Sequence, residues 1–302
     1  MYLDKYLKVV IAEKYDVTFK DPGTNPISIY RLRKQWRISM KGTSSRLREF
    51  LSLYDEIRKG GADKPILRFN KPYVGVYWIA DQFFCEKQVE ISMKIGELET
   101  ERTKRGKEFH EEISLGMEKA TIEQVWNEIL SGRNVRVSNL PLVAKWKGIP
   151  IIGRADLLCF SESKPLWLFE FKFTSMRIPP DSSHVQARLY SLLLKLMGLD
   201  TSILKYAIVL AKHKPKNFEK WRKSLIDRVK HHKILKEKTI LKINDCRIFI
   251  RKPELDKAES ELRFALKYWL GEREAIPTKN PSKCKACKYS AYCDSKPSTK
   301  LK

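Results

Sequence analysis

The sequence lacks any apolar run of about eighteen residues, which is the length that a membrane-spanning helix needs. Its first residues, MYLDKYLKVV, carry charges and contain no apolar signal-peptide core. These absences predict a cytoplasmic protein without a membrane partner. No G-x-x-x-x-G-K-[ST] pattern is present, so we expect no nucleotide-driven motor in the chain itself.

Acidic residues are also in short supply. The 302 residues include 60 Lys and Arg against 36 Asp and Glu, a formal net charge of +24. Between residues 201 and 252, 16 basic residues face four acidic ones, a net charge of +12. Such an excess is typical of proteins that bind a polyanion, and nucleic acid is the favoured partner over a merely soluble surface. The rings among these charges predict some base stacking, and they belong to Phe218, Trp221, His231 and His232.

Cysteine is rare as well, and its distribution is uneven. Three of the six cysteines lie in the last twenty residues, as Cys284-x₂-Cys287-x₅-Cys293. In a cytosolic chain this crowding favours metal or cluster ligation over disulfides, and a fourth thiolate must come from elsewhere. Cys159 and Cys246 lie in apolar strand-like runs and are expected to be small core residues.

The composition, with 42% hydrophobic residues, is that of a folded chain, and we divide it near Gly60-Gly61. Residues 1–70 are predicted to form a small helical domain with helices over 4–15, 26–39 and 46–59. The middle helix carries four basic residues, Arg31, Arg33, Lys34 and Arg37. They indicate either a bundle that contacts DNA or a basic face exposed to solvent.

Residues 71–302 are predicted to form one mixed α/β domain. Helices are expected over 76–95, around His110, over 183–198 and over 254–271. A tight turn at 161–164 should join two of the strands as a hairpin. The expected strand-like runs are 135–138, 141–146, 148–160, 165–174, 203–211 and 239–252.

The strongest chemical pattern is Asp156 followed, after the hairpin, by Glu170-Phe171-Lys172. Alternate residues of a strand share a face, so Glu170 and Lys172 point the same way, and the hairpin brings Asp156 alongside. Two carboxylates there suit Mg²⁺ or Mn²⁺, and the lysine can stabilise charge on a phosphodiester. The competing interpretation is a buried salt bridge within a sheet.

Four motifs in order strengthen the metal-site interpretation: GKEFH with His110, GRAD with Asp156, FEFK with Glu170, and VQARLY with Gln186 and Tyr190. This series resembles the RecB-like branch of the PD-(D/E)xK nucleases. The resemblance implies a restriction-endonuclease-like core, with a mixed central sheet flanked by helices. It implies Mg²⁺ or Mn²⁺ bound by His110, Asp156, Glu170 and the Phe171 carbonyl, catalysis by Asp156, Glu170 and Lys172, and substrate contacts by Gln186 and Tyr190.

The setting of Cys85, FFCEKQ, resembles the first cluster cysteine of iron–sulfur RecB-like nucleases, above all the family of the fourth CRISPR-associated (Cas) protein. The resemblance implies a [4Fe–4S] cluster held by Cys85 and a C-terminal segment at 284–293. Zinc in the same four-cysteine site remains an alternative. The implied ligands are Cys85, Cys284, Cys287 and Cys293.

The predicted function is metal-dependent cleavage of DNA, on single strands or frayed ends, by a metal-activated water. Exonuclease activity, and a role in CRISPR spacer acquisition or DNA repair, follow from the resemblance alone. One rival is a catalytically inactive DNA-binding or assembly module. A second rival is a processing enzyme that depends on CRISPR adaptation proteins, with residues 1–70 as the docking element. A third is a restriction-type endonuclease, which would not need the cysteine loop.

Overall fold

The structure is a computed structural model. It describes residues 10–12, 45–59, 67–113, 117–231, 238–243 and 245–296. The expected helix over 26–39, with Arg31, Arg33, Lys34 and Arg37, lies outside these residues, and so does His232. None of the helices described is long and apolar enough to cross a membrane.

The main sheet has eight strands in the order β10-β11-β9-β8-β7-β4-β1-β3. The central pair β8 and β9 is parallel and the other pairs are antiparallel, so the sheet is mixed, as predicted. The strands are β1 (Val10–Ala12), β3 (Glu118–Lys119), β4 (Val135–Ser138), β7 (Leu157–Ser161), β8 (Lys164–Phe173), β9 (Lys205–Ala211), β10 (Lys238–Ile243) and β11 (Cys246–Arg251).

A second sheet of three strands has the order β2-β6-β5, with β2 at Val74–Gly75, β5 at Pro141–Trp146 and β6 at Ile149–Arg154. The single strand expected over 148–160 is therefore wrong. The chain leaves the small sheet after Arg154 and enters the main sheet at Leu157, so Ala155 and Asp156 lie at the crossing between the two sheets.

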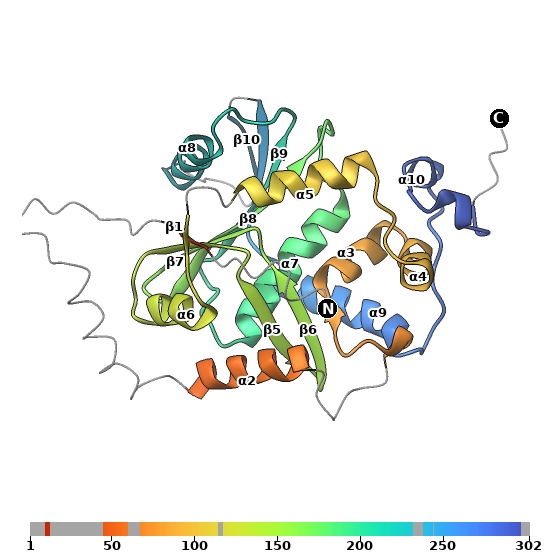
Figure 1. Ribbon diagram of the computed structural model, residues 1–302, viewed down its shortest axis with the longest axis horizontal. Coiled ribbons are helices and arrows are strands. Elements are labelled where there is room, and N and C mark those ends of the chain that lie inside the picture. Colours follow the sequence, from red (N-terminus) through yellow and green to blue (C-terminus); the bar gives the residue numbers. More distant parts are fainter. Residues whose placement is uncertain are drawn as a thin grey trace, which may run out of the picture.

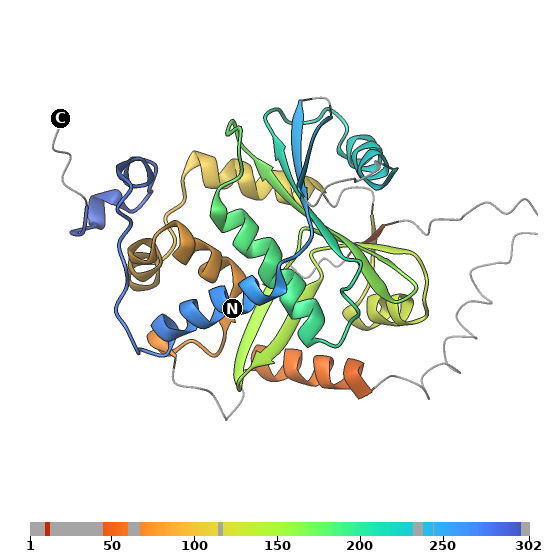
Figure 2. The same cartoon turned by 180° about the vertical axis from the view of Figure 1, so that it is seen from behind.

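Helices cover both faces of the main sheet (Figures 1 and 2). Helices α5 and α8 pack together over one face, whereas α7 lies on the other face and is backed by α9. The helices are α2 (Ser45–Lys59), α3 (Val76–Phe84), α4 (Glu86–Ile95), α5 (Glu101–Ile113), α6 (Ile122–Leu130), α7 (Asp181–Leu196), α8 (Phe218–His231), α9 (Leu255–Trp269) and α10 (Pro281–Lys285).

The alternation of residues along β8 explains the two layers. Phe169 and Phe171 enter the core beneath α5 and α8, whereas Leu168 enters the core beneath α7. The hairpin between β7 and β8 turns through Glu162 and Ser163, both with positive φ, as a two-residue type I′ turn requires. This turn is where the sequence predicts it.

Two helix predictions are wrong. The helix expected over 4–15 includes Val10–Ala12, which form β1 and pair with β4. The helix expected over 76–95 is broken at Cys85, whose φ of −169° and ψ of 121° are extended. Cys85 therefore ends α3 and precedes α4.

Helix α2 forms close to its predicted bounds and packs into the main core. Phe50 is buried, and its ring lies 5.3 Å from that of Trp126 on α6. The division of the chain at residue 70 stays a prediction. Cys159 and Cys246 are buried, as expected of core cysteines.

Candidate active site

Asp156 occupies the crossing between the two sheets. Its side chain is pinned there, because Oδ2 accepts a hydrogen bond of 2.7 Å from the backbone N–H of Phe171 on β8. Its other oxygen, Oδ1, lies 3.1 Å from Nδ1 of His110, in the last turn of α5. The carboxylate therefore joins β8 to α5.

Glu170 and Lys172 lie on β8, on the face that α7 covers. Glu170 is fully buried, and its Oε1 accepts a 2.6 Å hydrogen bond from Lys172 Nζ. Its second oxygen, Oε2, is buried without a hydrogen-bond partner among the residues described. An unpaired carboxylate oxygen in the protein interior is costly, so Glu170 has capacity for a further ligand.

Gln186 and Tyr190 on α7 extend this row of polar groups. Gln186 Oε1 accepts a 3.1 Å hydrogen bond from Lys172 Nζ, and Gln186 Nε2 donates one of 2.9 Å to the Tyr190 hydroxyl. The two residues are four positions apart and share a helix face, as the sequence indicates. In the structure Gln186 contacts Lys172 directly, and Tyr190 contacts it through Gln186.

The charges of the site shift one another's pKa values. Burial, and then the negative charge of Asp156, raise the pKa of Glu170 to about 7. Burial alone would also raise the pKa of Asp156, but the charge and hydrogen bond of His110 outweigh it and hold that pKa below its ordinary value. Glu170 is thus the carboxyl that retains a proton near neutral pH.

The carboxylates raise the pKa values of the two basic groups. Burial opposes the charged form of Lys172, but Glu170 and Asp156 outweigh it and raise the lysine's pKa. Burial likewise opposes protonation of His110, and Asp156 again outweighs it, so the pKa of His110 is raised. The site therefore pairs two basic groups with two carboxyls, and the charges of these groups shift one another's pKa values.

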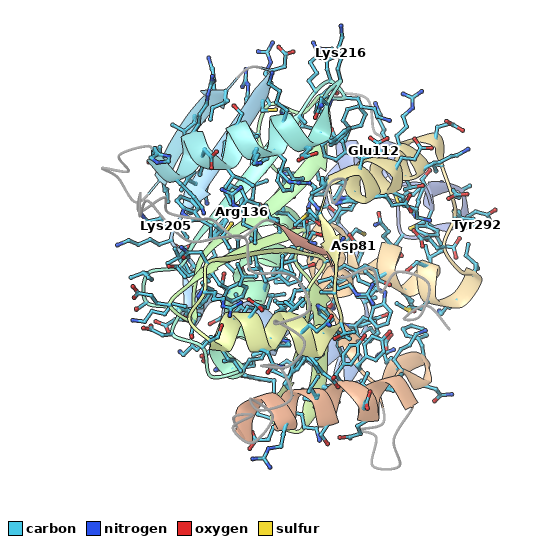
Figure 3. The ribbon with its side chains drawn as sticks, turned by 60° about the vertical axis from the view of Figure 1, so that its left-hand side comes forward. Asp81, Glu112, Arg136, Lys205, Lys216 and Tyr292 are labelled. Carbon is cyan, nitrogen blue, oxygen red and sulfur yellow. The ribbon has the colours of Figure 1, made fainter. Side chains whose placement is uncertain are left out.

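Asp81 on α3 is a further carboxyl of this site that the sequence analysis missed. Burial raises its pKa to about 6, while the charges of Lys172 and Lys288 partly offset that rise. Figure 3 shows Asp81 on the side of the molecule that also carries Glu112 of α5. The sequence contained one indication of Asp81, because this residue lies one helical turn before Cys85, which the motifs single out.

The four cysteines singled out by sequence lie near one another at one end of the molecule. In Figure 1, α10 with Cys284 lies beside α4, which Cys85 precedes. Burial raises the pKa of Cys287, and so do the charges of the other three, Cys85, Cys293 and Cys284. No disulfide forms among the six cysteines, all of which are free.

The basic segment after β9 reaches the same end of the sheet as Lys172, because β8 and β9 run parallel with Lys172 opposite Leu210. Of the rings predicted to stack on bases, Phe218 is buried and Trp221 is partly buried, whereas His231 is exposed. Phe218 is buried with its ring 5.3 Å from that of Phe109, and Trp221 lies 5.7 Å from Phe171. These two rings pack α8 on the sheet, and base stacking by the other rings of this segment stays a prediction.

Within the described part of the chain, no three His, Cys, Asp or Glu side chains are arranged as a ready-made metal-ion site. The donor set nevertheless suits a hard cation, since Glu170 Oε2 lacks a hydrogen-bond partner among the described residues and the carboxylate of Asp156 is near enough to raise the pKa of Glu170.

The sequence profile of the PD-(D/E)XK nuclease superfamily matches residues 45–294. No curated protein matches the chain. Among solved structures, the crystal structure of SSO0001 is similar at 16% identity and a TM-score of 0.42, covering 85% of this chain and 98% of that one.

Proposed function

Because the chain belongs to the PD-(D/E)XK nuclease superfamily, we propose that it is a metal-dependent deoxyribonuclease acting on single-stranded or frayed DNA ends. The observation that carries the proposal is the meeting of Asp156, Glu170 and Lys172 from adjoining strands. A salt bridge in a sheet needs only the glutamate and the lysine. Here a second carboxylate, a histidine and an unpaired oxygen share the same place.

Asp156, Glu170 and His110 would hold the divalent ion, with the Phe171 carbonyl as a further donor. When bound, Mg²⁺ or Mn²⁺ supplies a Lewis acid that lowers the pKa of water and offsets phosphate charge. Glu170 would lose its proton on binding the ion, because only the carboxylate is a good ligand.

Lys172 would stabilise the negative charge that develops on the phosphate, since its raised pKa keeps the ammonium charged at neutral pH. Gln186 accepts a second hydrogen bond from this ammonium, beside the one that Glu170 accepts, and Tyr190 in turn accepts one from Gln186. We therefore assign Gln186 and Tyr190 to positioning the lysine, beside any contact with the substrate strand.

Two substitutions test the chemistry. Asp156→Asn and Lys172→Ala should each lower Mg²⁺- or Mn²⁺-dependent cleavage of labelled DNA by about 100-fold or more. Lys164→Ala is the matched control, because Lys164 lies at the other end of β8 in an exposed pair with Asp200. Cleavage that survives in both variants would show that the activity arises elsewhere.

We propose exonuclease rather than endonuclease action, on the ground of the resemblance. Linear and circular single-stranded DNA of the same sequence distinguish the two. An exonuclease degrades the linear form alone, whereas cutting of the circle assigns an endonuclease. The placement in CRISPR spacer acquisition or DNA repair has the same ground, and genomic neighbours bear on it directly.

We also propose that Cys85, Cys284, Cys287 and Cys293 bind one [4Fe–4S] cluster. The support is that four free thiols lie within mutual electrostatic range, two of them with raised pKa values that bound metal would reverse. Anaerobically purified protein should contain iron and sulfide and absorb visible light, and Cys284→Ser should lose both. Cys159→Ser is the control, and stoichiometric zinc instead of iron would establish the alternative.

A further inference from the structure

Three aromatic side chains are grouped where α3 begins. The rings of Tyr73 and Trp78 stack with centroids 5.5 Å apart and planes at 7°. The Tyr77 ring lies 5.1 Å from that of Trp78. Trp78 is buried, whereas Tyr77 is 55% exposed. Burial of the Tyr77 hydroxyl raises its pKa, so the group presents part of one tyrosine ring to solvent on a packed aromatic support.

The backbone beneath this group is shaped to accommodate it. Gly75 separates Tyr73 from Tyr77, and a Cβ at Gly75 would approach the rings of Trp78 and Tyr77 at 3.2 Å. The rings therefore pack tightly over a position without a side chain.

The group lies next to the catalytic strand crossing. Strand β2, between Tyr73 and Tyr77, pairs with β6 at Ile151 and Ile152, four or five residues before Asp156. Along α3, Tyr77 is one helical turn from Asp81, and the charge of Asp81 acts on Lys172. The exposed ring is thus close to the residues that would cleave a phosphodiester.

Positive charges accompany the rings. Lys71 Nζ lies 5.5 Å from the Trp78 ring centroid, and Arg154 is near enough to lower the pKa of Tyr73, although burial raises that pKa overall. An apolar protein surface has no need of two cations beside the rings. A nucleic-acid strand uses rings to stack its bases and cations to pair with its phosphates. The net charge of +24 also favours a nucleic acid as the partner.

We propose that Tyr73, Tyr77 and Trp78, here called the α3 aromatic platform, bind a base of single-stranded DNA beside the scissile phosphate. The proposal rests on the proposed nuclease function and specifies its substrate. A base in the interior of a duplex has both faces covered by its neighbours, so it can stack on Tyr77 only where the strand is single or frayed. The platform thereby selects against intact duplex.

The test measures binding without cleavage, by fluorescence anisotropy of a labelled oligothymidylate in EDTA. Tyr77→Ala should weaken binding about 5- to 100-fold, the range for one stacked base. Tyr77→Phe should bind as the wild type does. Tyr77→Leu keeps an apolar contact with Trp78 but lacks a π-face, and it should also bind weakly.

Phe264→Ala is the matched control, because Phe264 is an exposed ring on α9 (44%) with Arg273 over it. It should leave the oligonucleotide affinity unchanged. An unchanged affinity in Tyr77→Ala overturns the platform, and so does full recovery by Tyr77→Leu, which would assign Tyr77 to packing. Equal losses for the oligonucleotide and a relaxed closed-circular duplex, which has no end, also overturn it.

The outcome is separate from that of the nuclease test. Cleavage abolished by Lys172→Ala together with unchanged binding in Tyr77→Ala removes the platform and keeps the nuclease. Selective loss of single-strand binding in a protein that cleaves nothing keeps the platform as a binding site and removes the proposed activity.

Discussion

Gly153 shows how a single missing side chain shapes the site. A Cβ there would lie 2.5 Å from the Tyr190 ring and 2.9 Å from Val76, contacts that real side chains do not make. The glycine of the GRAD motif therefore allows α7 and α3 to close over β6. Gly153 is needed because Tyr190 and Val76 approach its Cα closely, and not because of its backbone conformation, since its φ is ordinary.

We expect Gly153→Ala to lower the free energy of unfolding by about 1–3 kcal/mol, because the overpacked Tyr190 or Val76 must shift. Cleavage should fall too, as Tyr190 supports Gln186 and Lys172. Urea denaturation and the DNA assay measure both effects. Gly106→Ala on α5 is the control, since its Cβ meets open space, and a helical alanine there should be neutral or stabilising.

Glu170 gives the site a dependence on pH. Its pKa is raised from 4.5 to about 7 in the folded protein, so the proton favours folding. Its stabilising effect is complete below pH 4.5 and is lost as the pH rises through about 7. In EDTA, wild type should lose stability relative to Glu170→Gln between pH 5 and 8, on the order of 1–3 kcal/mol.

Added Mn²⁺ should reverse this trend, because the ion binds the carboxylate that forms above pH 7. Melting temperatures with and without Mn²⁺ across that range check the prediction. A metal-induced rise that is the same at pH 5.5 and 8, or one that persists in Glu170→Gln, would contradict the assignment of Glu170 as a ligand.

At the scale of elements, the sequence predicts what local patterns determine. The hairpin turn at Glu162 and Ser163 depends on neighbouring residues, and the helix ending near Gly198 shows a clear period. The break at Cys85 does not follow from the local pattern, since apolar residues continue at helical spacing on both sides. It depends on partners about 190 residues away, such as the Thr278 N–H, which lies 3.4 Å from Cys85 Sγ.

The attachment of the C-terminal segment to α4 has a polar centre at Glu86. This buried carboxylate accepts hydrogen bonds of 2.5 and 2.6 Å from Arg273 and one of 2.7 Å from the Ile276 N–H. We infer that the segment is anchored by these contacts as well as by its cysteines. Without these hydrogen bonds, the segment that carries Cys284, Cys287 and Cys293 would be held less firmly against α4.

Arg273→Ala should therefore reduce the free energy of unfolding by about 2–4 kcal/mol, because it leaves a buried carboxylate without its cation. Arg263→Ala, an exposed arginine on α9, should change it by less than about 0.5 kcal/mol. Denaturant titration compares the two. Similar small effects in both would mean that water or another cation satisfies Glu86.

Across the whole molecule, the residues that the motifs single out lie together in the candidate site, but the motifs do not indicate all of its surroundings. The residues of β8 and α7 meet because strand alternation and helical spacing fix their directions. Asp81 and Tyr77 could not be predicted in the same way, because the packing of α3 on α7 and β6 brings them there. Phe218 was misassigned for the same reason, since only the tertiary structure shows which rings are covered.

The distribution of charge leads to the last prediction. Lys212 and Lys216 are exposed on the segment after β9, at the sheet end where Lys172 lies, and Lys216 projects outward in Figure 3. Each phosphate contact on a single strand contributes about 0.7 to the slope of log affinity against log salt. The double substitution of both lysines by alanine should thus reduce that slope by about 1.4. Lys164 and Lys195, at the opposite end of the sheet, provide a control of equal charge, and an equal reduction in both variants would mean that net charge alone attracts the DNA.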